Sequence, residues 1–288
     1  MTPLSLEAPA KLNLTLRVVG RRADGYHLID SELVLLDLAD RLLLMPGATG
    51  LRVEAAADGE VPVGRENLAW RGLVAGYGGE PELAFLALEK QIPAGAGLGG
   101  GSSDAAAAWR LGRHVAGLVG TPSQDDLVAL TRVGADVAFF AAALPAARVA
   151  GIGELVRPAA LLPAQFAVIA VPRIRLSTAA VFAELRTSDL AEGHERGNDL
   201  LAPALRLCPE LDDVMRAVAT AGGEPRLSGS GTTVFTLTED PERAAAIATR
   251  LSGGQLQVIE TPLRRSAAEI LELDDAAPDA GAPLPSMG

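Results

Sequence analysis

The sequence has little cysteine and no long apolar run. Cys208 is the single cysteine in 288 residues, which excludes an intramolecular disulfide framework and favours a reducing compartment. The three histidines are too scattered to suggest a zinc site with Cys208. The N-terminus has no basic and apolar leader, and no stretch reaches about 18 apolar residues without a charge or a proline. We therefore expect a cytoplasmic protein that does not span a membrane.

The chain also has fewer basic than acidic residues. The chain has 25 Lys and Arg against 36 Asp and Glu, a formal net charge of −11. Proteins that bind nucleic acids neutralise phosphates with a net basic face, so a nucleic-acid partner is not expected. With 49% hydrophobic and 21% charged residues, the chain can bury at least one sizeable core. A globular protein with a small-molecule ligand is the expectation, and the oligomeric state is left open.

The hydrophobic pattern predicts an α+β fold in two parts. Apolar residues alternate from Leu12 to Val18, which predicts a half-buried strand with Lys11 and Asn13 on its other face. The expected strands are 32–36, 42–45, 51–55, 83–89, 166–171, 232–237 and 255–260. The expected helices are 67–77, 102–115, one opened by Ser123 and Asp126, one opened by Ser177 or Thr178, 198–207, 211–221 and 241–251.

The strongest chemical signal is a glycine-rich segment that leads into a helix, Pro93-Ala94-Gly95-Ala96-Gly97-Leu98-Gly99-Gly100-Gly101-Ser102-Ser103. Glycines let the backbone approach an anion closely, and a helix N-terminus adds partial positive charge. Ser102 and Ser103 offer hydroxyls for a phosphate or a phosphate-bound Mg²⁺. The segment predicts a phosphate site, although a flexible loop with ordinary serine caps gives the same pattern.

Two familiar phosphate loops fit this segment poorly. A P-loop ends in Gly-Lys, and this chain has no Gly-Lys pair. Gly95, Gly97 and Gly100 have the spacing of a dinucleotide-binding loop, yet Pro93 separates them from the preceding strand and no clean βαβ pair follows.

Two charged residues stand out against the composition. Lys11 and Lys90 are the only lysines among 25 basic residues, which leaves 25 − 2 = 23 arginines. A compact ammonium at Lys11 is therefore conspicuous. Asp136 interrupts the most apolar stretch of the chain, 133–147. It is a candidate for catalysis or for a helix cap after Gly134.

Five motifs occur in an order that resembles the GHMP kinases, and among them the kinases of 4-diphosphocytidyl-2-C-methyl-D-erythritol. They are the segments 9–14 (PAKLNL), 24–27 (DGYH), 93–103, 134–140 (GADVAFF) and 227–231 (LSGSG). The resemblance implies an N-terminal domain like domain 2 of ribosomal protein S5, at 1–157, and a ferredoxin-like C-terminal domain, at 158–273. Residues 274–288, rich in Ala, Pro, Gly and Asp, are predicted to form a disordered tail.

The resemblance also implies a reaction. ATP would donate its γ-phosphoryl group, with Mg²⁺, to the 2-hydroxyl of the methylerythritol moiety in the non-mevalonate isoprenoid pathway. Asp136 matches the family's catalytic aspartate and Lys11 the lysine beside it. Another GHMP kinase, acting on homoserine, mevalonate or a sugar, is the alternative. A nucleotide-binding module without activity is a third.

Substrate contacts are carried over from the same resemblance. Tyr26 and His27 match residues that hold the cytosine ring, and Phe182 matches an aromatic on its other face. Thr178 and Asn13 match further substrate contacts. Asn67 matches the segment that lines the adenine pocket, and it is equally well explained as a helix cap. The chain departs from the family pattern at Asp104, where other members carry Asn. This departure places a negative charge near the expected triphosphate.

Overall fold

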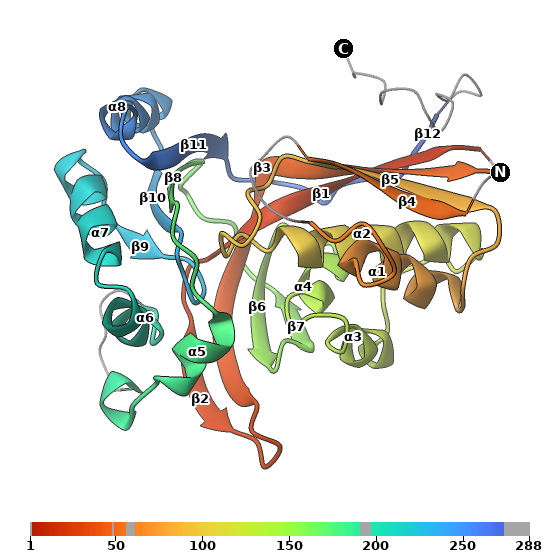
Figure 1. The fold of residues 1–288 in the computed structure, drawn as a ribbon, viewed down its shortest axis with the longest axis horizontal. Coiled ribbons are helices and arrows are strands. Elements are labelled where there is room, and N and C mark those ends of the chain that lie inside the picture. The colour runs from red at the N-terminus through yellow and green to blue at the C-terminus, as the bar shows by residue number, and fades with distance from the viewer. Residues whose placement is uncertain (1, 48, 56–60, 191–196, 274–288) are drawn as a thin grey trace.

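The computed structural model of the chain describes residues 2–47, 49–55, 61–190 and 197–273. The predicted tail, 274–288, lies outside the described residues. The described strands form two sheets with helices packed against each (Figure 1). In these ranges no helix is long and apolar enough to cross a membrane.

The first sheet is organised around one long strand, β3 (His27–Pro46). Its N-terminal half pairs with β2 (Arg17–Arg21) and β6 (Ala146–Gly151), and its C-terminal half with β1 (Leu4–Asn13) and β5 (Ala84–Lys90). The sequence predicts two separate strands here. They are one strand because the polar residues between them continue the ladder, with Asp40 opposite Ala8. The remaining strands of this sheet are β4 (Gly50–Ala55), β7 (Leu155–Pro158) and β12 (Leu271–Glu272).

Helices cover one face of this sheet (Figure 1). They are α1 (Leu68–Tyr77), α2 (Gly100–Val115), α3 (Gln124–Leu130) and α4 (Val137–Ala141). Apolar side chains of β1, β3 and β5 meet α1 and α2 in one core, with Leu42 and Leu73 fully buried. The two helices lie so close that a Cβ at Gly72 would fall 2.0 Å from the Ala105 carbonyl oxygen, so only glycine fits there. The predicted cap at Asn67 is confirmed.

The second sheet is antiparallel, in the order β11-β8-β10-β9. Its strands are β8 (Phe166–Pro172), β9 (Arg226–Leu227), β10 (Val234–Thr238) and β11 (Leu256–Pro262). The helices of this half are α5 (Thr178–Ala183), the 3₁₀ turn η1 (Thr187–Leu190), α6 (Leu201–Leu207), α7 (Leu211–Thr220) and α8 (Pro241–Leu251). Val168 and its neighbours on one face pack against α7 and α8.

The opposite face of the second sheet packs on the first. Ile169 and Phe235 share a core with Leu12 and Leu36, so no solvent layer separates the two sheets at this point. Sheet membership changes between β7 and β8, while β12 returns to pair with β1. The predicted domain limits at 157, 158 and 273 stay predictions.

Candidate active site

The glycine-rich loop runs from the end of β5 to the start of α2. Gly95, Gly97 and Gly99 have φ angles of 72°, 78° and 76°, a region that residues with a Cβ rarely adopt. The loop and the N-terminus of α2 border a cavity of about 560 Å³. All residues predicted for ATP from Pro93 to Ser102 line it, but the buried Ser103 does not. Main-chain N–H groups and the helix dipole suit this cavity to phosphate.

Lys11 and Asp136 meet beside this loop. The Lys11 side chain is only 4% exposed, and its Nζ lies 3.5 Å from Asp136 Oδ2. The Lys11 N–H also donates to the Leu98 carbonyl at 2.9 Å, which joins β1 to the loop. Asp136 occupies the position before α4, yet its side chain makes no capping hydrogen bond. The carboxylate contacts the lysine, and its side chain is 34% exposed to solvent.

Asn13 fixes the lysine from the other side. Its Oδ1 accepts from Lys11 Nζ at 2.6 Å, and its Nδ2 donates to Ser31 Oγ at 2.9 Å. Asn13 is 5% exposed, so it is not the solvent-facing polar residue that a strand of this pattern would also allow. The amide orients a buried ammonium toward Asp136.

A loop of the second half closes the site, and the sequence analysis did not place its residues there. Ser228 Oγ accepts from the Asn13 N–H at 3.2 Å, and a Cβ at Gly229 would lie 3.5 Å from Lys11 Nζ. Ser230 Oγ and Thr178 Oγ1 are 2.9 Å apart. The motif 227–231 was a signal for these contacts, and those of Ser228 and Gly229 with β1 join residues more than two hundred positions apart.

Asn198 anchors that loop. Its buried Nδ2 donates to the carbonyl oxygens of Leu227 and Gly229, each at 2.9 Å, while its Oδ1 accepts from the Leu200 N–H. A β-bridge joins Asn198 to Leu16 just beyond β1. One side chain thus ties the loop to the strand that carries Lys11.

An aromatic pair joins the start of β3 to α5, the helix whose first residue, Thr178, lines the cavity. The rings of His27 and Phe182 stack with their centroids 5.1 Å apart and their planes 24° apart. Burial, and then the charge of Arg21, lower the pKa of His27. Tyr26 is 63% exposed, and Thr178 opens α5 and lines the cavity. The structure brings Phe182 to His27, while Tyr26 stands in solvent.

Asn67 lines the cavity while both ends of its amide are in use. Its Oδ1 accepts from the Ala69 N–H at 2.8 Å, and its Nδ2 donates to the Pro62 carbonyl at 2.6 Å. The side chain therefore fixes the start of α1 at the rim of the cavity.

A buried ionic cluster lies beneath the start of α2. Lys90 Nζ donates to Asp104 Oδ2 at 2.7 Å and to Asp40 Oδ2. Asp40 Oδ1 accepts from the N–H groups of Gln91 and Ile92 at 2.6 and 2.8 Å. Asp104 therefore pairs with the ammonium of Lys90. The sequence analysis had placed its negative charge near the expected triphosphate without this partner.

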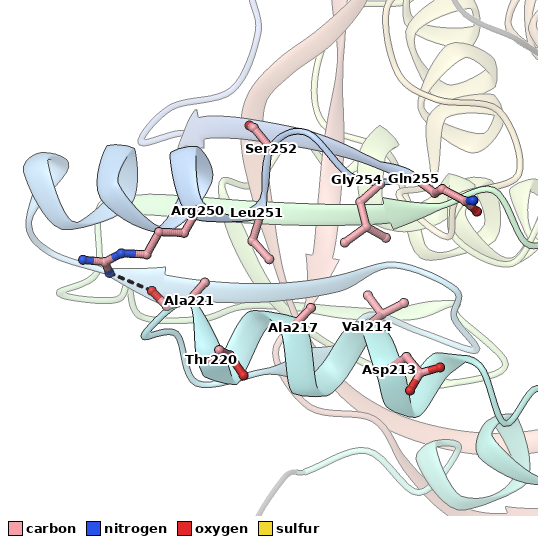
Figure 2. Close-up of a pocket in the computed structure, with 11 residues that line it drawn as sticks. Asp213, Val214, Ala217, Thr220, Ala221, Arg250, Leu251, Ser252, Gly254 and Gln255 are labelled. Carbon is pink, nitrogen blue, oxygen red and sulfur yellow. Dashed lines mark hydrogen bonds between the residues drawn. The ribbon is translucent and has the colours of Figure 1, made fainter.

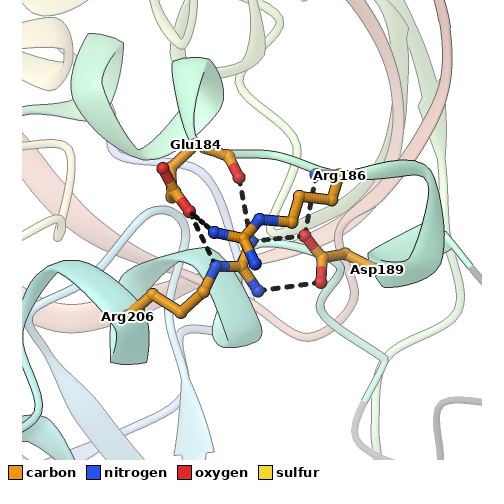
Figure 3. A network of polar contacts seen from close by, with 4 residues as sticks. All are labelled: Glu184, Arg186, Asp189 and Arg206. Carbon is orange, nitrogen blue, oxygen red and sulfur yellow. Dashed lines mark hydrogen bonds and ion pairs between the residues drawn. The ribbon is translucent and has the colours of Figure 1, made fainter.

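A second ionic network joins the C-terminal end of α5 to α6 (Figure 3). Arg206 of α6 donates to both oxygens of Asp189, to Glu184 Oε1 and to the Glu184 carbonyl at the C-terminal end of α5. Arg186 donates to the same Glu184 carboxylate at 2.6 Å. Two cations and two anions balance, and they hold the helix that carries Thr178 and Phe182.

A second cavity, of about 660 Å³, lies between α7, the end of α8 and the start of β11 (Figure 2). Val214, Ala217 and Leu251 give it an apolar floor, and Arg250 bonds to the Ala221 carbonyl at its rim. None of the predicted site residues borders it.

Fold and site together define the GHMP kinase class. Two family profiles match: GHMP kinases N terminal domain over residues 67–143, and GHMP kinases C terminal over residues 181–254. The structure resembles a homoserine kinase from Cytophaga hutchinsonii with a TM-score of 0.65, covering 94% of this chain and 98% of that one at 17% identity. That likeness shows the fold alone.

Proteins with higher sequence identity to this chain identify the family within the GHMP kinases. A 4-diphosphocytidyl-2-C-methyl-D-erythritol kinase from Dinoroseobacter shibae is 42% identical over 273 residues, which cover 87% of this chain and 91% of that protein. The crystal structure of a 4-(cytidine 5'-diphospho)-2C-methyl-D-erythritol kinase matches with a TM-score of 0.71 and 36% identity, covering 90% of this chain and 99% of that one. The chain belongs to the 4-diphosphocytidyl-2-C-methyl-D-erythritol kinase family.

Proposed function

We propose that this kinase transfers the γ-phosphoryl group of ATP to the 2-hydroxyl of 4-diphosphocytidyl-2-C-methyl-D-erythritol, in the cytoplasm and within the non-mevalonate isoprenoid pathway. The observation that carries the proposal is the contact of Lys11 with Asp136 beside the glycine loop. Phosphoryl transfer needs positioning, charge neutralisation and a group that takes the hydroxyl proton. The cavity, the lysine and the carboxylate supply these three functions.

Each group has a separate task. Asp136, without a capping bond of its own, accepts the proton of the attacking hydroxyl. Lys11, held by Asn13, stabilises the negative charge on the alkoxide and the transferred phosphoryl group. The glycine loop and the N-terminus of α2 hold the nucleotide phosphates through main-chain N–H groups.

Mg²⁺ is part of the proposal. Within the described ranges no three His, Cys, Asp or Glu side chains gather as a metal site, but Mg²⁺ in kinases relies on substrate phosphates, water and one or two protein oxygens. Two hydroxyls fit this need, because Ser102 lines the cavity and Ser103 Oγ is buried with no partner in the part of the chain that the structure describes. The ion would neutralise charge on the β- and γ-phosphates.

The acceptor is recognised at the outer end of the site. The Phe182 and His27 pair offers an aromatic surface for a cytosine ring, and Tyr26 is free to cover the ring from solvent. Thr178, joined to Ser230, lies between this surface and the cavity. An acceptor without a base, such as homoserine or mevalonate, would leave these aromatic residues without a role.

A coupled assay of ADP release tests the proposal. The purified chain is supplied with ATP, Mg²⁺ and, in turn, the cytidyl substrate, homoserine, mevalonate and galactose, with Asp136→Asn as the control for contaminating kinases. We expect turnover with the cytidyl substrate alone. Preferred turnover of any other acceptor would refute the assignment.

A further inference from the structure

The glycine loop contacts a second loop besides its bond to β1, and this contact is made by main-chain atoms. A Cβ at Gly97 would lie 2.9 Å from the Gly231 carbonyl oxygen and 3.4 Å from the Ser228 carbonyl oxygen. The loop that follows β9 therefore packs directly on the glycine loop. The segment expected to bind phosphate belongs to the first half of the chain, but it rests on the second half.

The side chain of Thr233 fastens this contact. Thr233 immediately precedes β10 and is fully buried. Its hydroxyl donates to the Ala96 carbonyl of the glycine loop. Its own carbonyl oxygen accepts from the Ser228 N–H at 3.0 Å. Thr233 thus holds the loop 227–231 through its main chain and the glycine loop through its side chain.

The bond from Thr233 decides which way a peptide of the glycine loop faces. The C=O and N–H of a planar trans peptide point in opposite directions, so this bond turns the Gly97 N–H away from Thr233. The Lys11 N–H holds the Leu98 carbonyl in the same way and turns the Gly99 N–H away from β1. Gly97 and Gly99 line the cavity, and no described residue accepts a hydrogen bond from either N–H. Two carbonyl oxygens that would repel a phosphate are thus occupied, while two N–H groups suited to bind one have no partner in the described chain.

We propose that Thr233 is a positioning residue for nucleotide binding, which holds the glycine loop in the form that offers its N–H groups to the phosphates. The inference rests on the proposed function in taking ATP as the ligand. Thr233 does not line the cavity, so it acts through the Ala96 carbonyl. Its neighbour Thr232 supplies a matched reference, because this buried hydroxyl donates at 3.0 Å to the carbonyl of Ile174, outside the glycine loop.

Nucleotide affinity separates this role from a purely structural one. Thr233→Val keeps the shape of the side chain but leaves the Ala96 carbonyl without its donor. In isothermal titration with a non-hydrolysable ATP analogue and Mg²⁺, its Kd should be about tenfold higher than that of the wild type. The Kd for the cytidyl substrate should not change, because the main chain of Thr233 still holds Ser228. Thr233→Ser keeps the hydroxyl and should restore the nucleotide affinity, although the lost methyl group lowers its Tm.

The control is Thr232→Val, which removes the same kind of bond one residue away and should leave the Kd for the analogue unchanged. If Thr233→Val does not fold, Thr233→Ser and Thr233→Ala give the same comparison, since both lack the methyl group and only serine keeps the donor. The proposal is wrong if the valine variant at 233 binds the analogue as the wild type does, or if Thr232→Val loses as much affinity. Either result would leave the proposed kinase activity intact, whereas a wild type that does not bind the analogue would refute that activity and this inference together.

Discussion

The two sides of the site are made from different kinds of groups. On the proposed nucleotide side, ten consecutive residues, 93–102, border the cavity without a charged side chain. Glu66, Lys90 and Asp104 also line it, and Lys90 is occupied by the carboxylates of Asp40 and Asp104. On the proposed acceptor side, the Lys11 ammonium contacts the side chains of both Asn13 and Asp136. The nucleotide side should therefore be sensitive to added atoms, and the acceptor side to removed groups.

The largest expected effect is on the acceptor side. Asp136→Asn keeps the shape of the side chain but cannot accept the hydroxyl proton, so kcat should fall by about 10²- to 10⁴-fold, with both affinities nearly unchanged. Lys11→Met should also lower kcat strongly. Steady-state kinetics with each substrate varied will measure both.

The double variant sharpens this result. If Lys11 and Asp136 act as one unit, the double variant should lose much less than the product of the two single effects. A folded Asp136→Asn enzyme with near-normal kcat would remove Asp136 from the chemistry and leave positioning and phosphate electrostatics as the source of catalysis.

The next effect tests added atoms on the nucleotide side. A Cβ at Gly99 would lie 2.9 Å from the Phe140 ring and 3.0 Å from Lys11 Cγ, whereas at Gly95 it would meet nothing described within 4 Å. Both glycines have positive φ, so both alanine variants carry the same backbone strain. Gly99→Ala should lose about 1 to 3 kcal/mol more stability than Gly95→Ala, because overpacking adds to the strain.

Urea unfolding of the two variants without nucleotide measures that difference. Equal losses for Gly95→Ala and Gly99→Ala would show that the loop yields to a methyl group, and the contrast with the acceptor side would fail.

A smaller effect is expected at the aromatic end. Phe182→Ala should weaken the cytidyl substrate by about 1 to 3 kcal/mol, the usual contribution of stacking a base on an aromatic ring, and leave the KM for ATP unchanged. Tyr26→Ala, at an exposed position, should weaken the same substrate without loss of stability. Isothermal titration with the cytidyl substrate and with ATP separates the two ligands. Equal loss of both would assign Phe182 to the core.

The smallest effects concern the ion pairs outside the site. Arg216 on α7 pairs with Asp212 and Asp213, and all three side chains are more than half exposed, so Arg216→Met should change the unfolding free energy by less than about 1 kcal/mol. Arg206→Met should lower stability more and raise the KM for the cytidyl substrate, since Arg206 holds the end of α5. An unchanged KM would show that α5 is positioned without the network of Figure 3.

Local chemistry made much of the fold predictable. The Asn67 cap and the Ser123 and Asp126 capping box are confirmed, because each needs only neighbours three residues or fewer away. The start and end of α8, at Pro241 and Leu251, are also confirmed. The hairpin of β6 and β7 was missed, since β6 is rich in alanine, which is depleted in strands, and β7 is only 4 residues long.

The site was less predictable from the sequence than the fold, because its contacts join segments that lie far apart in the chain. The glycine loop, Lys11 and Asp136 were identified from motifs and composition, but their distances depend on packing between sheets. Asn198 was assigned to a helix, and it instead precedes α6 and anchors the loop at Gly229. Asp40 gave no signal at all, because a buried acid is recognised only by its partner, Lys90.

The pairing of β12 with β1 has a consequence for the synthesis of the protein on the ribosome. Leu4 pairs with Glu272, a separation of 272 − 4 = 268 residues. A ribosome that adds about 5 to 20 residues per second makes these two strands roughly 13 to 54 s apart. During that interval the nascent chain exposes the outer edge of β1 at Leu4, and unpaired strand edges are the sites where chains aggregate. The first sheet to begin is thus the last to be completed.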